Sequence, residues 1–307
     1  MARWLSLILL GGTALPAQEV KRPRITGVAH IALFSRDVAQ SRMFYTGLLG
    51  YEEPFDLKQP DGSLALTFFK INERQYIELF PEREPGSDRL AHIALETDDA
   101  EGMRRYLASK GIQIPEKVPK GRTGNSNFTV RDPDGHGVEI VQYEPSSWTS
   151  RERGKHLSAM RISEGMLHVG ILVGAVEPAM RFYRDILGFR ETWRGSRDGK
   201  ELNWINMQVP DGSDYVEFML YQELPAPGQR GTPHHLCLVV PDLAKALAQL
   251  ESRPARKDYT RPIEGRVGVN RRRLANLYDP DGTRTELMEP ATVDGTPTPS
   301  STAPPPR

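Results

Sequence analysis

Hydrophobic and polar positions alternate in short runs along most of this chain. The run "HIALFS" (30–35) changes face with a period of two, which is typical of a half-buried strand. The runs "LALTFFKI" (64–71) and "RQYIELF" (74–80) are rich in β-branched and aromatic residues and follow turn residues. The pattern therefore predicts strands at these three places.

A helix is predicted between the first two of these strands. Val38, Phe44 and Leu48 have helical spacing, Asp37 is suited to cap the first turn, and Gly50 is suited to end the helix. The order strand, helix and further strands defines a βαβββ module.

Internal repeats show that this module is used more than once. Residues 28–53 recur as residues 167–191, and "RDPDGHGVEIV" (131–141) recurs as "YDPDGTRTELM" (278–288). The two halves of the chain are therefore duplicates of each other.

Each half divides again. Residues 90–111 repeat the pattern of 28–50, and residues 234–252 are a fourth copy. One such module is too small to bury a core, so we expect pairs of modules to share a curved sheet. We predict an α+β fold in which four βαβββ modules form two cupped mixed β-sheets, with a first domain at 25–144, a linker at 145–163 and a second domain at 164–290.

The two ends of the chain have different compositions. Residues 1–17 combine Arg3, an apolar run and a small-residue exit, which indicates a signal peptide and an exported protein. The apolar run is shorter than the ~20 residues of a membrane-spanning helix, so we expect no membrane anchor. Residues 291–307 are rich in Pro, Ser and Thr, and we expect a disordered tail there.

Composition and charge exclude some classes of function. The 40 basic and 40 acidic residues give a net charge of zero, which argues against a nucleic-acid partner. Cys237 is the only cysteine and is interpreted as a small buried apolar residue. Any metal ion must therefore be held by His, Asp or Glu.

Eight residues recur in register across the four modules. Each module has a histidine in its first strand and a glutamate in its last strand. A glutamate among apolar strand neighbours is costly to bury unless it is paired or binds a metal. His and Glu together suit a divalent ion such as Zn, Ni, Co, Mn or Fe. The candidate ligands are His30, Glu78, His92 and Glu139 in the first half, and His168, Glu217, His235 and Glu286 in the second.

The remaining histidines and one loop receive other interpretations. We expect His136, His156 and His234 to face solvent. The glycine-rich stretch "GRTGNSNF" (121–128) precedes no helix pattern, so it is a poor phosphate site, and we expect it to line a pocket.

The motifs "FYTGLLGY", "AHIAL", "YIELF" and "DPDGHGVEIV" resemble those of the vicinal oxygen chelate superfamily, and the resemblance covers residues 25–290. That superfamily includes glyoxalases, bleomycin-resistance proteins and extradiol dioxygenases. The resemblance implies that two modules form each cup and that the first and last strands supply the metal ligands.

The order His, Glu, His, Glu looks most like that of bacterial lactoylglutathione lyases. The resemblance implies a metal-dependent lyase or isomerase that acts on a small substrate with vicinal oxygens, with Glu139 or Glu286 as the catalytic base. The Arg and Asn that hold glutathione in those lyases are absent from "HIALFS" and "ELFPE" (78–82). The resemblance therefore does not extend to glutathione.

Two alternatives remain open. Extradiol dioxygenases share the four-module architecture, and position would give His168, His235 and Glu286 as an Fe(II) site in the second half. The bleomycin-resistance members bind a small molecule without catalysis. The expected partner is a small-molecule substrate in every case, and the chain is expected to be a monomer or a homodimer.

Overall fold

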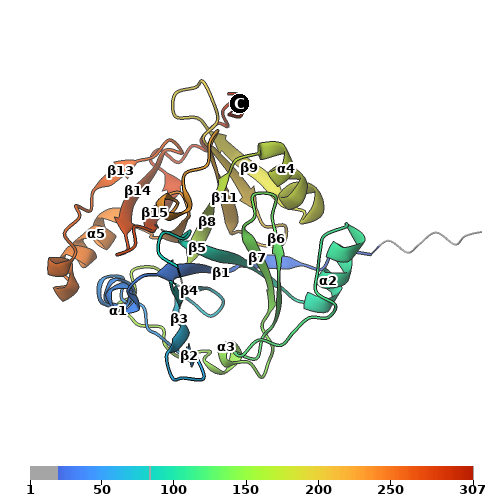
Figure 1. The fold of residues 1–307 in the computed structure, drawn as a ribbon. Helices are drawn as coiled ribbons and strands as arrows, with labels where there is room; N and C mark the ends of the chain where they lie inside the picture. The colour runs from blue at the N-terminus through green and yellow to red at the C-terminus, as the bar shows by residue number, and fades with distance from the viewer. Residues whose placement is uncertain (1–19, 83, 307) are drawn as a thin grey trace, which may run out of the picture.

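Two curved sheets, one from each half of the chain, make up the protein (Figure 1). The computed structural model describes residues 20–82 and 84–306, so the predicted signal peptide at 1–17 lies outside the described residues. No helix in the described part of the chain has the length and apolar character needed to cross a membrane.

The first sheet has seven strands in the order β2-β3-β4-β1-β5-β7-β6. Its strands are β1 (Ile25–Ser35), β2 (Asp56–Lys58), β3 (Leu64–Lys70), β4 (Tyr76–Pro81), β5 (Leu90–Thr97), β6 (Ser126–Arg131) and β7 (Gly137–Gln142). The second sheet has eight strands in the order β13-β14-β15-β12-β8-β11-β10-β9. Its strands are β8 (Met166–Val173), β9 (Arg190–Gly195), β10 (Trp204–Gln208), β11 (Tyr215–Leu220), β12 (His235–Val239), β13 (Gly265–Val267), β14 (Arg272–Tyr278) and β15 (Arg284–Thr292).

Each sheet is built from two modules joined at their first strands. Within a module the first and last strands pair in parallel, as β1 does with β4 and β5 with β7. The first strands of neighbouring modules pair antiparallel, β1 with β5 and β8 with β12. This arrangement confirms the α+β fold with paired modules. In the second module an isolated bridge between Lys120 and Ser126 stands where the other modules have an additional strand.

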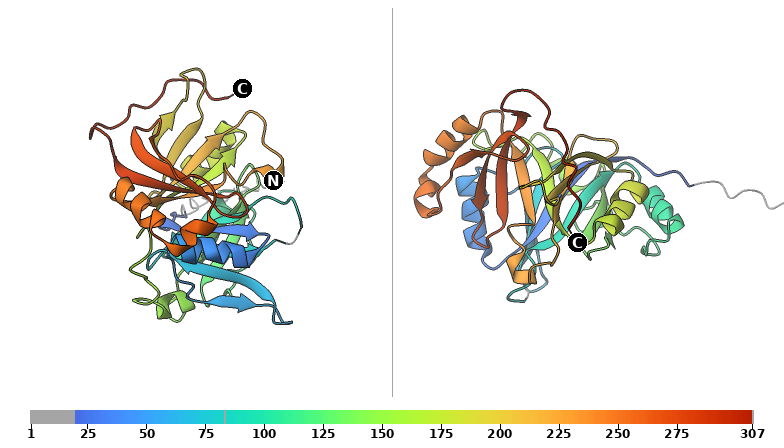
Figure 2. Two further views of the ribbon diagram at one scale, coloured as in Figure 1. Left: turned by 90° about the vertical axis from the view of Figure 1, so that its left-hand side faces the viewer. Right: turned by 90° about the horizontal axis from the view of Figure 1, so that it is seen from above.

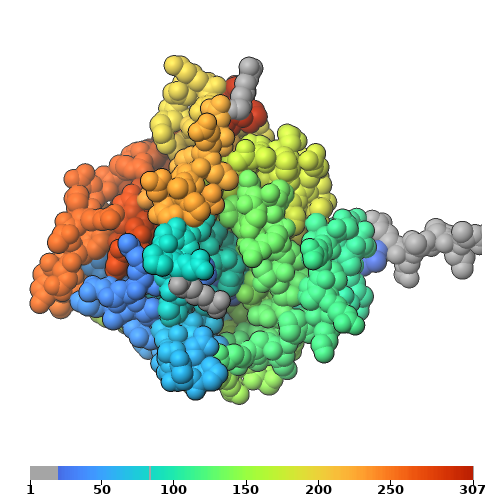
Figure 3. All heavy atoms as spheres, in the orientation of Figure 1, coloured from blue at the N-terminus to red at the C-terminus, as the bar shows by residue number. Residues whose placement is uncertain are grey.

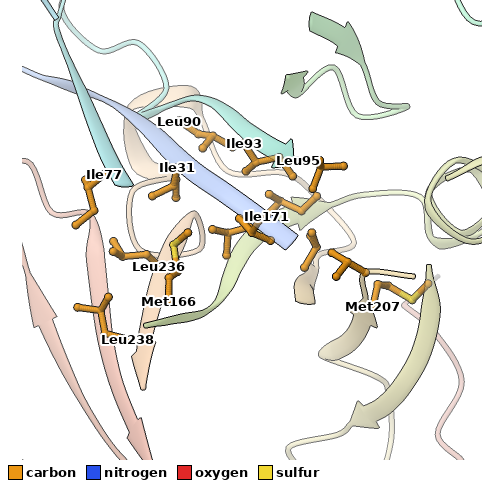
Figure 4. Close-up of a cluster of buried hydrophobic side chains, with 14 of the residues drawn as sticks. Ile31, Ile77, Leu90, Ile93, Leu95, Met166, Ile171, Met207, Leu236 and Leu238 are labelled. Atoms are coloured by element: carbon orange, nitrogen blue, oxygen red, sulfur yellow. The ribbon is translucent and has the colours of Figure 1, made fainter. Parts of the chain in front are cut away.

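The outer faces of the two sheets pack against each other and form the main core (Figure 4). Ile31 and Ile93 of the first sheet meet Ile171 and Leu236 of the second, and all four are fully buried. Burying such a side chain contributes about 1.5–3 kcal/mol. Because side chains alternate along a strand, the inner faces point away from this core, and the two cups open on opposite sides of the molecule.

Helices cover the flanks of the stacked sheets (Figures 1 and 2). As predicted, Asp37 caps the first helix by accepting a hydrogen bond from the Gln40 amide, and Gly50 ends that helical segment with φ of 78°. The helices are α1 (Val38–Arg42), α2 (Ala100–Ser109), α3 (Trp148–Arg151), α4 (Val176–Met180) and α5 (Leu243–Glu251), with π-helical turns η1 (Met43–Leu48) and η2 (Arg181–Ile186) and 3-10 turns η3 (Pro227–Gln229) and η4 (Pro254–Asp258). The space-filling view shows the two halves in contact across the width of the molecule (Figure 3).

The C-terminal segment differs from the disordered tail predicted for 291–307. Strand β15 continues to Thr292, and the residues after it lie along the edge strand β9. The Ser301 amide donates to the Arg194 carbonyl at 2.9 Å, the Leu202 amide donates to the Pro304 carbonyl at 2.8 Å, and Ala303 is buried. An exposed edge strand offers unpaired backbone groups, and an extended Pro-rich segment can use them without an apolar core of its own.

Candidate metal centres

The first cup brings together all four predicted residues of the first half. His30 lies on β1, Glu78 on β4, His92 on β5 and Glu139 on β7, which are neighbouring strands of one sheet. The two histidine Nε2 atoms are 3.0 Å apart. Both carboxylate Oε2 atoms lie between 3.0 and 3.6 Å from these nitrogens.

These distances fit a single divalent ion. Nitrogen and oxygen ligands lie about 2.0–2.2 Å from such an ion, which places neighbouring donor atoms about 3 Å apart. Glu78 Oε2 is also buried and has no hydrogen-bond partner. Its nearest polar neighbours are the Nε2 atoms of His92 and His30 at 3.2 and 3.4 Å, and a cation held between these three residues would also be bound by this oxygen. His30, Glu78 and His92 each offer a donor atom within 4.8 Å of the other two and therefore fit a metal ion, and Glu139 Oε2 lies beside them at 3.0 Å from His92 Nε2.

The histidines and glutamates of the first cup stabilise each other's charged forms. Burial alone lowers the pKa of His92, but the carboxylates of Glu139 and Glu78 outweigh burial and raise it to about 10. Burial raises the pKa of Glu139, but its hydrogen bonds with His30 and His92 hold it well below the ordinary value. The Asn127 amide donates to Glu139 Oε1 at 2.9 Å and fixes the orientation of that carboxylate.

The second cup brings together the other four predicted residues at slightly longer distances. The Nε2 atoms of His168 and His235 are 3.1 Å apart. Glu217 Oε2 lies 3.3 Å from the His235 nitrogen and 3.8 Å from that of His168. Glu286 Oε2 lies 3.5 Å from the His168 nitrogen and 4.0 Å from that of His235.

Burial dominates the protonation of the second cup. It lowers the pKa of His168 to about 3 and raises that of Glu286 to about 7. Cys237 is buried, as predicted, but it is more than an apolar residue. Its Sγ and one ligand atom each of His168 and Glu286 all lie within 4.8 Å of one another. Burial raises the pKa of this thiol well above its usual range.

The cups differ at the residue two positions before the last glutamate. In the first cup this residue is Gly137, where a Cβ atom would lie 2.9 Å from the Cβ of His92. In the second cup it is Arg284, whose Nη2 lies 2.8 Å from Nδ1 and 2.9 Å from Nε2 of His235. The second cup therefore carries a cation against one of its candidate ligands.

A cavity of about 170 Å³ adjoins the first set of residues. Its walls include Phe55, Phe68, Tyr76 and Tyr143, with Arg122 as the one arginine. As predicted, the 121–128 stretch lines this pocket, through Gly121, Arg122, Thr123, Asn125 and Asn127. The linker covers it from the other side, because Thr149 also lines the cavity and Trp148 packs edge-on against Phe55 at 5.4 Å.

Two histidines predicted to face solvent are buried at the junction between the halves. His136 Nδ1 lies 2.8 Å from Asp132 Oδ2, and His234 Nδ1 lies 2.9 Å from Asp88 Oδ1. Their rings are in edge contact at 5.1 Å. Period-two alternation sends His234 away from the second cup, but the face it reaches is the buried contact between the sheets, which a single-strand pattern does not show.

The family model of the glyoxalase/bleomycin resistance protein/dioxygenase superfamily matches residues 27–140 and 165–287. Among curated proteins, a metapyrocatechase from Geobacillus stearothermophilus is 24% identical over 280 residues, covering 86% of this chain and 80% of the relative. A lactoylglutathione lyase from Schizosaccharomyces pombe is 24% identical over 293 residues, covering 86% of this chain and 90% of the relative.

Solved structures show the same fold. A variant of homoprotocatechuate 2,3-dioxygenase from Brevibacterium fuscum superposes with a TM-score of 0.66 at 18% identity, covering 95% of this chain and 78% of that one. The Mn(II)-bound glyoxalase from Novosphingobium aromaticivorans superposes with a TM-score of 0.63 at 16% identity, covering 92% and 88%. The matched repeats, the two cups and the family model together establish that this chain belongs to the glyoxalase/bleomycin resistance protein/dioxygenase superfamily.

Proposed function

We propose that this protein is a metal-dependent lyase or isomerase that acts on a small substrate with two adjacent oxygens, and that the first cup is its reaction centre. One observation carries the proposal: the Nε2 atoms of His30 and His92 lie 3.0 Å apart, and the Oε2 atoms of Glu78 and Glu139 each lie 3.0–3.6 Å from both nitrogens, beside a cavity of about 170 Å³. A divalent ion held there would act as a Lewis acid that binds the two oxygens and stabilises developing negative charge.

The residues of the first cup supply the remaining chemistry. Glu139 is the proposed base, because its carboxylate lines the cavity and Asn127 holds its Oε1 in one orientation. It would take a proton from the carbon that bears one oxygen and return it to the adjacent carbon. The aromatic walls favour a substrate with an apolar side group.

Metal content followed by an activity screen tests this function. The protein is purified without chelator, its Ni, Zn, Co, Mn and Fe contents are measured, and methylglyoxal hemithioacetals are offered as substrates. We expect Glu139→Gln to lower kcat by about 10²-fold or more, because it removes the base. The matched variant Glu286→Gln in the second cup is expected to retain activity. Activity that survives both changes, separately and combined, would refute the assignment.

Ring cleavage by an extradiol dioxygenase is the second candidate, favoured by the similarity to a metapyrocatechase. That reaction would use His168, His235 and Glu286 with Fe(II). The contact of Arg284 with His235 and the 4.0 Å separation of His235 and Glu286 favour the first cup instead. Oxygen consumption with catechol and Fe(II), lost in Glu286→Gln and kept in Glu139→Gln, would select this second candidate.

A further inference from the structure

Three arginines without carboxylate partners line the second cup. Two adjoining cavities of about 290 and 70 Å³ share Trp193 and Asn270 in their walls. Arg272 lines the larger cavity, and Arg266 and Arg284 line the smaller one. Within residues 20–82 and 84–306, no carboxylate oxygen lies within the 4.0 Å ion-pair distance of these three guanidinium groups.

Two buried donors in the smaller cavity also have no acceptor. Arg284 Nε and the indole Nε1 of Trp193 are buried and make no hydrogen bond in the described part of the protein. Buried donors without acceptors cost folding free energy. The lining residues of the smaller cavity therefore carry positive charge, and two donors without acceptors belong to those same residues.

The first cup has no arginine at the positions that correspond to Arg272 and Arg284. The repeats 131–141 and 278–288 are offset by 147 residues, so Arg272 corresponds to Asn125 and Arg284 to Gly137. These two changes add cations to the second cup, whereas Arg122 of the first cavity corresponds to Val269. The duplicated halves have therefore diverged in the charge of the ligand that they can accept.

The strand residues beside the glutamates are also more polar in the second cup. Phe68 pairs with Glu78 in the first cup, whereas Asn206 pairs with Glu217 in the second. Trp204 joins Trp193 in the wall of the smaller cavity, so two indole rings are available for the apolar part of a ligand.

We propose that the second cup binds a small organic dicarboxylate. Arg266, Arg272 and Arg284 outnumber the two carboxylates of Glu217 and Glu286, so the cup remains attractive to an anion. The planar guanidinium groups match carboxylate oxygens. This site goes beyond the proposed reaction and does not depend on it.

Titration of the full chain with succinate, followed by tryptophan fluorescence, tests the proposal. Trp193 and Trp204 line the smaller cavity, so binding is expected to give a saturable change in emission. Raising the ionic strength should weaken binding, and the neutral analogue succinamide should give no saturable change. A succinamide response equal to that of succinate would overturn the role of charge.

Matched variants locate the site. Arg272→Asn and Arg284→Gly introduce the residues of the first cup, and each is expected to lower succinate affinity at least tenfold. Arg122→Gln in the first cup is the control and should leave the affinity unchanged. Thermal unfolding checks that each variant is folded, and Arg272→Asn keeps the test valid if Arg284→Gly disturbs His235.

The outcomes separate this inference from the proposed function. Glu139→Gln should remove activity and leave succinate binding intact. An absence of saturable succinate binding at millimolar concentration, or binding that Arg122→Gln abolishes and the second-cup variants do not, would overturn the proposal while leaving the first-cup assignment in place.

Discussion

The phenol of Tyr45, in the first half of the chain, donates a hydrogen bond to Asp279 Oδ2 in the second half at 3.1 Å. The reciprocal pair is also present, because Tyr183 donates to Asp132 Oδ2 at 3.1 Å. Both tyrosines come from the repeated Phe-Tyr motif, and both aspartates come from the repeated Asp-Pro-Asp-Gly turn. Each motif therefore contacts the other half, which gives the two repeats a shared role in joining the halves.

The two aspartates of these pairs differ in their remaining partners. Asp132 also contacts the ring of His136 at 2.8 Å, whereas the corresponding position beside Asp279 holds Thr283. Burial raises the pKa of Asp279 to about 7, from an ordinary value of 3.8. The strength of the Tyr45–Asp279 pair therefore depends on pH.

Replacing Asp279 by Asn is expected to remove a pH dependence of stability. Between pH 4 and about 7 the unfolded chain ionises this carboxyl while the folded protein keeps it protonated, so stability falls as pH rises. The loss is complete above pH 7 and is on the order of 2–4 kcal/mol. We expect Asp279→Asn to be more stable than the wild type at pH 8, with a smaller difference at pH 5, as measured by urea unfolding.

Asp132→Asn is the matched control, because it breaks the contact with His136 without relieving a buried unpaired charge. It is expected to destabilise the protein by about 1–3 kcal/mol at pH 8. If Asp279→Asn and Asp132→Asn shift stability in the same direction at pH 8, burial of the Asp279 carboxylate does not destabilise the folded protein at that pH.

Period-two alternation and repetition were enough to predict which side chains meet. His30 and Glu78 are far apart in sequence, but both alternate onto the inner face of strands that pair in parallel, so their approach follows from the module itself. The same reasoning holds for His168 and Glu217 in the third module. These contacts depend only on the alternation within each strand and on the parallel pairing of the first and last strands of one module.

The covers of the two cups could not be predicted in this way. Thr149 of helix α3 in the linker lines the first cavity, and the segment after Thr292 lies beside the second, where Pro297 and Thr298 line the wall. In each half the cover is the chain that follows the last strand. Neither cover has the apolar periodicity from which packing is inferred, because backbone hydrogen bonds and single side chains hold them.

Adding one methyl group beside His92 tests the geometry of the first centre. In Gly137→Ala the new Cβ would lie 2.9 Å from His92 Cβ and 3.1 Å from the Ala91 carbonyl oxygen. The strand backbone is paired on both sides, so His92 must move. We expect metal affinity to fall at least tenfold and stability to fall by about 1–3 kcal/mol, as measured by metal titration and thermal unfolding.

Gly170→Ala makes the matched change in the second cup. There the new Cβ would overlap the ring of His235, whose nearest atom lies 1.9 Å away, and the first cup is untouched. Activity and first-centre metal binding should survive Gly170→Ala and not Gly137→Ala. Equal losses in both variants would contradict the assignment of the reaction to the first cup.

Lys70 holds the linker over the first cup. Its ammonium group is fully buried, pairs with Glu73 at 2.9 Å, and donates to the carbonyls of Glu152 and Lys155 at 2.5 and 2.9 Å. We expect Lys70→Met to cost about 2–4 kcal/mol and to expose residues 145–163 to protease, because two carbonyls lose a charged donor. The Lys155 side chain is 60% exposed, so Lys155→Met should change stability by less than about 0.5 kcal/mol. A stable, protease-resistant Lys70→Met would show that the linker is held by other contacts.

Removal of the C-terminal segment tests its contact with the second half. Deleting residues 296–307 removes the backbone hydrogen bonds to Arg194 and Leu202 and the buried methyl group of Ala303. We expect a loss of about 1–2 kcal/mol in the free energy of unfolding. Acrylamide should also quench tryptophan emission more strongly, because Pro297 and Thr298 leave the wall that they share with Trp193.

Deleting only residues 305–307 leaves these contacts in place and serves as the control. Since the segment does not reach the first cup, metal binding there should stay unchanged, and a truncated protein with wild-type unfolding and quenching would show that the segment contributes nothing to the second half.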